Sequence, residues 1–180
     1  MTRPLTRFLR RFRRDEDGSA LVIEFCIFVP LLFGAFLMAV EMGVYSMRQM
    51  YLDRGLDIAV RYIRLNTSTN YTHADIKKII CNNTGWLENC DQTLRLEMVS
   101  VNPRQFSAFD QDPDCVDTSE PARPVRGFAL GKANEMMMLR ACIKFKPLYP
   151  STGLGYAFEK DGTGRARMIA SAAFVQEPDS

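Results

Sequence analysis

The sequence contains a single histidine, His73, and a single tryptophan among its 180 residues. It also lacks a nucleophile elbow, a Walker loop, an HExxH pair and paired CxxC motifs. These motifs supply the activated nucleophiles, phosphate-binding loops and metal ligands of common enzyme classes. We therefore expect no catalysis by this chain, no cofactor and no metal site.

Two weaker metal patterns do not change that expectation. The stretch DQDPDC, residues 110–115, resembles the first half of a calcium loop. It lacks the glycine at the sixth position, and its twelfth position is Pro121 where such loops have a glutamate. A zinc site is not expected, because the cysteine spacing fits no zinc knuckle and only His73 could add a histidine ligand. We interpret His73 as a solvent-facing residue in the first turn of a helix.

The basic residues are concentrated at the N-terminus. Residues 1–18 hold six of the 23 basic and three of the 21 acidic residues, which gives them a net side-chain charge of +3. Residues 19–180 carry a net charge of −1, although the whole chain is at +2. A basic face for nucleic acid is therefore not expected on the larger part of the chain, and no nucleic acid partner is predicted.

An apolar run follows this leader from Ser19 to Val40, with Glu24 as its one charged residue. As a helix these 22 residues would span about 33 Å, close to the roughly 30 Å core of a bilayer. Thirteen of them are Leu, Ile, Val or Phe. They favour insertion by about 4–8 kcal/mol, whereas one acid costs about 3 kcal/mol at the centre and less near an end. We predict a membrane helix over 19–42.

The arginines before the run predict a cytoplasmic N-terminus, with the C-terminal part of the chain across the membrane. A cleaved secretory signal is the competing interpretation. It is disfavoured because the run is longer than a signal h-region and no A-x-A site follows at Ala39–Ser46.

Four of the five cysteines follow the run, on the side predicted to be translocated. Four cysteines in an oxidising compartment indicate two disulfides, with three possible connectivities. Cys81 and Cys90 flank the turn-rich stretch NNTGWLEN, which favours that pair and leaves Cys115 with Cys142. The fifth, Cys26, is interpreted as a small apolar residue of the membrane helix.

The remaining chain has helix-like and strand-like segments. One helix from about Leu21 to Leu65 is predicted, with Leu52, Leu56, Ala59 and Ile63 on its buried face. A short helix follows NTSTN (66–70), with Thr72 as a candidate N-cap and Asp75 three residues on. Alternating segments over 93–101, 137–147 and 165–176 predict strands, and residues 102–134 a long loop. The predicted fold class is α+β, a small antiparallel sheet packed on the second half of the long helix.

A carboxylate inside an apolar helix indicates a functional site, although Glu24 is near enough to the run's start that snorkelling to the interface is the alternative. Pro30 removes the amide donor to the carbonyl of Cys26, so we expect a kink or a local loosening there.

The stretches DEDGSALVIEF and VPLLFGAF, within residues 15–50, resemble the TadE-like group of the tight-adherence (Flp, type IVb) pilus system. The resemblance implies a pseudopilin: a cytoplasmic leader over 1–18, and a pilin-like domain over 43–180 in the periplasm of a bacterium. It implies a structural role in assembling an adhesive pilus. The implied partners are other pilins, the Tad inner-membrane machinery, the lipid bilayer and a prepilin peptidase.

The same resemblance implies that the peptidase cuts at the Gly18–Ser19 edge and that the new amine pairs with Glu24 of a neighbouring subunit. The family places this glutamate fifth after the cut. A cut after Gly18 makes Glu24 sixth, and a cut after Ser19 makes it fifth. We expect processing after Gly18; an uncut anchor is the alternative. A membrane-anchored periplasmic enzyme or sensor is the competing function.

Overall fold

The computed structural model describes residues 17–66, 70–85, 87–104, 112–116 and 127–178. The chain forms two compact units, Met1–Val40 and Glu41–Ser180. We call the second unit the head. The sequence places the corresponding boundary at 42/43, close to the division between the units.

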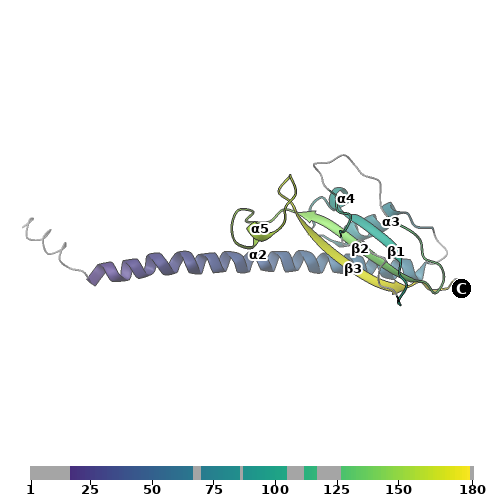
Figure 1. Cartoon of the computed structure of the whole chain (residues 1–180), viewed down its shortest axis with the longest axis horizontal. Helices are drawn as coiled ribbons and strands as arrows, with labels where there is room; N and C mark the ends of the chain where they lie inside the picture. Colours follow the sequence, from purple (N-terminus) through teal and green to yellow (C-terminus); the bar gives the residue numbers. More distant parts are fainter. Residues whose placement is uncertain (1–16, 67–69, 86, 105–111, 117–126, 179–180) are drawn as a thin grey trace, which may run out of the picture. The chain divides into compact units, whose positions relative to one another are not determined.

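The long helix α2 covers Asp17–Leu65 and continues through Pro30 (Figure 1). Up to Val40 none of its described side chains is buried within the chain, and most of the large apolar ones are well exposed. An 18-residue stretch of this helix is apolar enough to cross a membrane, which makes α2 a candidate membrane span by length and composition.

Beyond Glu41, α2 becomes amphipathic and its buried face belongs to the core of the head. The predicted residues are confirmed, since Leu52, Leu56, Ala59 and Ile63 are all at most 2% exposed. They recur every three or four positions, so they share one helix face. This face packs against the sheet.

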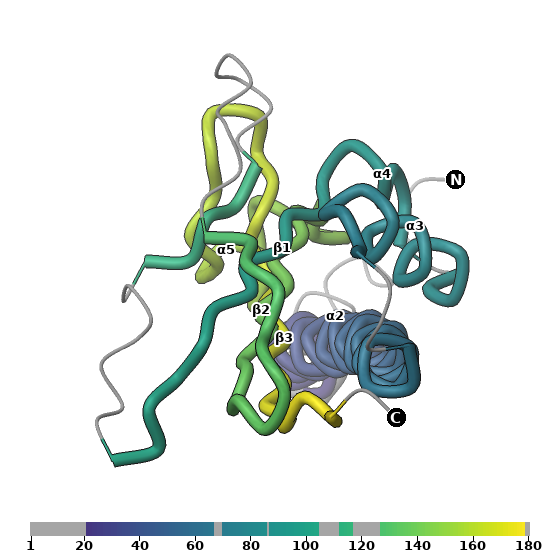
Figure 2. The backbone as a smooth tube through the Cα atoms, turned by 90° about the vertical axis from the view of Figure 1, so that its right-hand side faces the viewer, coloured from purple at the N-terminus to yellow at the C-terminus, as the bar shows by residue number. Residues whose placement is uncertain are grey.

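The sheet has the strand order β1-β2-β3, with both pairs antiparallel. β1 covers Arg95–Ser100, β2 Met136–Phe145 and β3 Ala166–Val175. Figure 2, which looks nearly along α2, shows the strands beside the helix. The inward residues alternate along each strand, as the sequence predicts, and the α+β class is confirmed. The inward residues of β2 are Met137, Leu139, Ala141, Ile143 and Phe145.

In the described part of the head, three short helices accompany α2 and the sheet. α3, His73–Asn83, begins with the predicted cap: the Asp75 amide donates to the Thr72 hydroxyl, and the Thr72 amide donates to the Asp75 carboxylate. The Thr72 hydroxyl also donates to the Asp75 carboxylate at 2.6 Å, and this hydrogen bond, together with the one from the Thr72 amide, lowers the pKa of Asp75. α4, Cys90–Thr93, and α5, Gly153–Ala157, were not predicted, because four or five residues are too few to show a helical period.

The predicted loop over 102–134 is only partly irregular among its described residues. Phe128 forms a parallel bridge with Met98 of β1. The Met98 amide donates to the carbonyl of Gly127, and the Ala129 amide donates to the carbonyl of Met98. A short extended segment therefore lies along the free edge of β1, which blunts an edge that would otherwise be open to pairing.

Candidate functional site

Glu24 lies on an apolar face of α2. It is exposed and makes no hydrogen bond or ion pair with the part of the chain that the structure describes. The large apolar residues three and four positions away are Leu21, Ile27 and Phe28, which are each more than 60% exposed. Nothing in the described chain offsets the charge of this carboxylate, so any counter-charge has to come from outside it.

The other predicted residues of this unit also lie on α2. Gly18 and Ser19 are in its first turn, directly after Asp17. The leader before them, residues 1–16, lies outside the described residues. Pro30 is inside the helix, and the kink expected there stays a prediction. Cys26 has an exposed, unbridged thiol.

Glu41 connects the start of the head to a segment far along the chain. The sequence analysis did not identify this residue. Its side chain is only 3% exposed. One carboxylate oxygen accepts a hydrogen bond from the amide of Gly155 at 2.9 Å, and the other accepts one from the amide of Tyr149 at 3.3 Å. A buried carboxylate is stable only when its oxygens are satisfied in this way. Glu41 therefore ties α5 and the turn before it to α2.

Gly155 permits this contact because it has no side chain. A Cβ at this position would collide with the carbonyl of Tyr149 and lie 2.6 Å from the Glu41 carboxylate. The sequence signal for the site was weak. It consisted of an acid directly after an apolar run and of the glycine-containing stretch TGLGYAF far along the chain. Neither feature indicates by itself that the two segments meet.

The four cysteines of the head form two disulfides with the favoured connectivity. Cys81 pairs with Cys90 across Cα atoms 5.6 Å apart, and Cys115 pairs with Cys142 across 5.3 Å. The first links the end of α3 to the start of α4. The second fastens the segment 112–116 to the middle of β2, on the face of the sheet turned away from α2.

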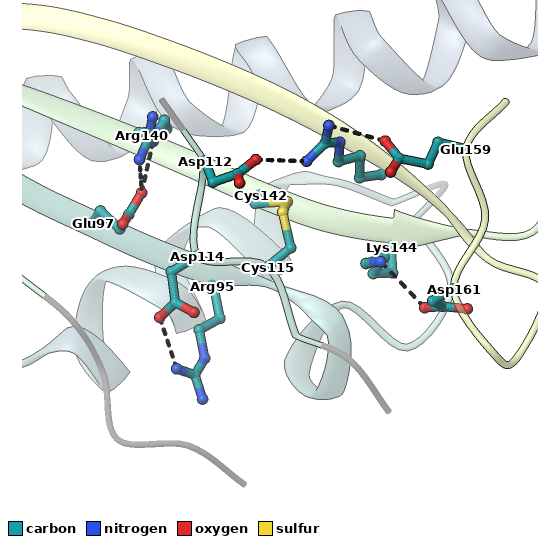
Figure 3. Close-up of a disulfide and its surroundings, with 11 residues drawn as sticks. Arg95, Glu97, Asp112, Asp114, Cys115, Arg140, Cys142, Lys144, Glu159 and Asp161 are labelled. Atoms are coloured by element: carbon teal, nitrogen blue, oxygen red, sulfur yellow. Dashed lines mark hydrogen bonds and ion pairs between the residues drawn. A yellow bond between two sulfur atoms is a disulfide. The ribbon is translucent and has the colours of Figure 1, made fainter. Parts of the chain in front are cut away.

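That outer face carries a row of fixed side chains on β2 (Figure 3). Arg140 forms an ion pair with Glu97, its cross-strand partner on β1, with an Nε–Oε2 distance of 2.6 Å. Lys144 forms one with Asp161 at 3.2 Å. Between them, Cys142 carries the disulfide. The side chains of Arg140 and Lys144 are largely covered there, because the segment 112–116 and the turn at Asp161 also lie on this face.

The Asp161 carboxylate also organises the turn before β3. It accepts hydrogen bonds from the Thr163 hydroxyl at 2.7 Å and from the Arg165 amide at 2.9 Å. Burial alone would raise the pKa of Asp161, but these bonds and the Lys144 ammonium lower it overall. The charged form is thus the one that the turn stabilises.

The expectation that His73 faces solvent is wrong. Its ring is half-buried, packed edge-on against Phe128 with centroids 5.6 Å apart. Its Nε2 accepts a hydrogen bond from the Leu96 amide at 3.2 Å, which requires the neutral imidazole. Burial lowers the pKa of His73, and the nearby charges of Lys77 and Arg95 lower it further. The error arises because β1 and Phe128, which cover the ring, are distant in sequence.

Two hollows among the described residues of the head can be compared with ligand pockets. A cavity of about 80 Å³ is lined by Arg48, Lys144, Lys146, Arg165 and five neighbouring residues. Ligand pockets usually measure about 300–1,000 Å³. A larger hollow, lined by Tyr45, Met50 and Asp57 among others, is a shallow groove on α2 alone. Among the described residues, no three His, Cys, Asp or Glu side chains cluster as metal ligands would.

Comparisons of the chain with known protein families, curated proteins and solved structures find no match.

Proposed function

We propose that this chain is a single-pass membrane protein of the TadE-like type, with a structural role in assembling an adhesive Flp pilus. In this proposal the N-terminus is cytoplasmic, the apolar run Ser19–Val40 crosses the bacterial inner membrane and the head lies in the periplasm. The exposed apolar part of α2 and the two disulfides of the head support this arrangement.

The position of Glu24 is the observation that carries the proposal. Its carboxylate sits among exposed apolar side chains and has no partner in the described chain. In a bilayer an unpaired acid costs about 3 kcal/mol at the centre of a helix and less near an end, where Glu24 lies, and a cation from another subunit would offset that cost. The amine freed by cleavage after Gly18 is the cation that the family resemblance provides.

This role for Glu24 can be separated from a role in insertion. We expect Glu24→Gln to keep the protein in the membrane and to reduce pilus assembly, because the amide is similar in shape but carries no charge. Glu24→Ala should have the same effect. Insertion is measured by carbonate extraction of membranes, and piliation by electron microscopy and by the amount of sheared pilin.

Glu88→Gln provides the matched control, since Glu88 is an exposed carboxylate of the head with no partner among the described residues. It should leave both insertion and piliation unchanged. Normal piliation in the Glu24→Gln strain would contradict the pairing role. Loss of the Glu24→Gln protein from the membrane would show instead that the residue serves insertion.

A further inference from the structure

The loop 147–160, which contains α5, is anchored at the first residue of the head. Glu41 holds it through the amides of Tyr149 and Gly155. In the chain Glu41 directly follows Val40, the last residue of the apolar run. If the run spans a bilayer, 22 helical residues cover about 33 Å of a roughly 30 Å core, so Glu41 reaches the boundary between hydrocarbon and headgroups.

The side chains that this loop exposes are those typical of a membrane–water interface. Tyr156 is 73% exposed and Leu148 is 47% exposed. The ammonium of Lys160 lies 5.7 Å from the centre of the Tyr156 ring and donates to the carbonyls of Tyr156 and Phe158. Tyrosine at the headgroup level and lysine with an apolar stem are both enriched at interfaces.

The burial of Glu41 is compatible with a position at the boundary between hydrocarbon and headgroups. Both carboxylate oxygens accept backbone hydrogen bonds from the loop, so the charge is not presented to lipid. On the surface next to it, Met42 is also exposed, at 53%. Leu148, Tyr156 and Met42 are thus exposed directly beside Tyr149, Gly155 and Glu41 in the sequence, while the Glu41 carboxylate itself is buried.

We infer that the loop 147–160 is a membrane-surface contact, with Tyr156 and Leu148 lying among phospholipid headgroups. This inference rests on the proposed function, because it requires the apolar run to cross the bilayer. The contact would fix the tilt of the head on the membrane, since it adds a second attachment beside α2.

The test uses single tryptophans in the full chain, reconstituted in nanodiscs of phosphatidylethanolamine and phosphatidylglycerol. Trp86 is replaced by phenylalanine in every variant. Tyr156→Trp reports on the loop. Tyr62→Trp is the matched control, because Tyr62 is an exposed tyrosine of the head that lies 21 residues, about 32 Å, further along α2 than Glu41. Phe28→Trp reports on the apolar run.

Quenching by doxyl-labelled lipids and by aqueous iodide gives the depth of each tryptophan. We expect Trp at 156 to be quenched by lipid labelled near the headgroup and protected from iodide, and Trp at 62 to show the reverse. Trp at 28 should be quenched by lipid labelled deep in the acyl chain.

Each other outcome overturns a defined part of the account. If Trp at 156 behaves like Trp at 62 while Trp at 28 is quenched from the acyl chain, the span stands and the membrane contact is wrong. If Trp at 156 escapes both quenchers, protein covers the loop and lipid does not. If Trp at 28 escapes the deep label, the span itself is wrong, and this inference fails with it.

Discussion

The carboxylate of Glu41 accepts a hydrogen bond from the amide of Gly155 at 2.9 Å, although 114 residues separate the two in the chain. A second hydrogen bond, from Tyr149, completes the site. Through this contact, α2 is attached to the loop between β2 and β3. Both hydrogen bonds of the attachment depend on the side chain of Glu41 alone.

Glu41→Ala should destabilise the head by about 1–3 kcal/mol, because it leaves the buried amide of Gly155 and the partly buried amide of Tyr149 without an acceptor. The amides of Gly155 and Tyr149 should lose more of their protection from hydrogen exchange than the amides of the strands do. Hydrogen exchange read by mass spectrometry measures this. Glu41→Gln, which keeps one acceptor oxygen, should lose less protection; equal and unchanged protection in both variants would contradict the role of Glu41.

Gly55 and Gly43 lie on the same helix and should respond in opposite ways to alanine. A Cβ at Gly55 would lie 2.5 Å from the Thr84 methyl group and 3.3 Å from the Ile80 carbonyl, whereas a Cβ at Gly43 meets nothing within 4 Å. Gly43→Ala should be neutral or stabilise by up to about 1 kcal/mol, the helix-propensity gain. Gly55→Ala should destabilise by about 1–3 kcal/mol, because it forces α3 away from α2. Urea unfolding followed by circular dichroism gives both values. Equal effects of the two substitutions would show that α3 does not pack closely at Gly55.

The two disulfides should differ in their contribution to stability. In the chain-entropy model, the Cys81–Cys90 loop gives about 2.7 kcal/mol and the longer Cys115–Cys142 loop about 3.5 kcal/mol. Replacing both cysteines of a pair by serine should lower the free energy of unfolding by these amounts. Non-reducing gels and thiol counting check the pairing first. Four reactive thiols in the oxidised head of the wild-type protein would contradict both bridges.

The neutral state of His73 predicts a pH dependence of stability. Its pKa is lower in the folded protein than the ordinary value of 6.5, so the unfolded chain binds the proton more readily. The contribution of His73 is therefore complete above about pH 6.5 and is lost as the pH falls through 6.5 towards its folded pKa. His73→Gln keeps an acceptor for the Leu96 amide but cannot be protonated. Between pH 7.5 and 5, wild type should lose more stability than this variant, as measured by urea unfolding; parallel pH curves would contradict the account.

The parts of the head that the sequence predicted follow from short-range patterns. Leu52, Leu56 and Ile63 share one face because helical spacing alone puts them there, and Thr72 caps α3 because Asp75 stands three residues on. The cysteine pairing followed from a turn-rich loop between Cys81 and Cys90.

What the sequence missed depends on contacts between distant segments. The burial of His73 is produced by Phe128 and β1, and that of Glu41 by the loop around Gly155. Both residues are polar and lie within helices. The local pattern placed His73 in solvent and Glu41 at the end of the membrane helix, and neither position indicates the distant segment that covers it. The contact of Asp161 with Lys144 on the outer face of the sheet was missed for the same reason, since Asp161 reaches that face from a turn 17 residues further along the chain.

The N-terminus of the mature protein tests the central claim most directly. Mass spectrometry should compare the intact protein purified from wild-type cells and from cells without the prepilin peptidase. The proposed function predicts a wild-type protein that begins at Ser19 and a mutant-strain protein that keeps the leader from Met1 or Thr2. An intact leader in both strains would contradict a processed pseudopilin and favour an uncut anchor that carries an enzyme or sensor.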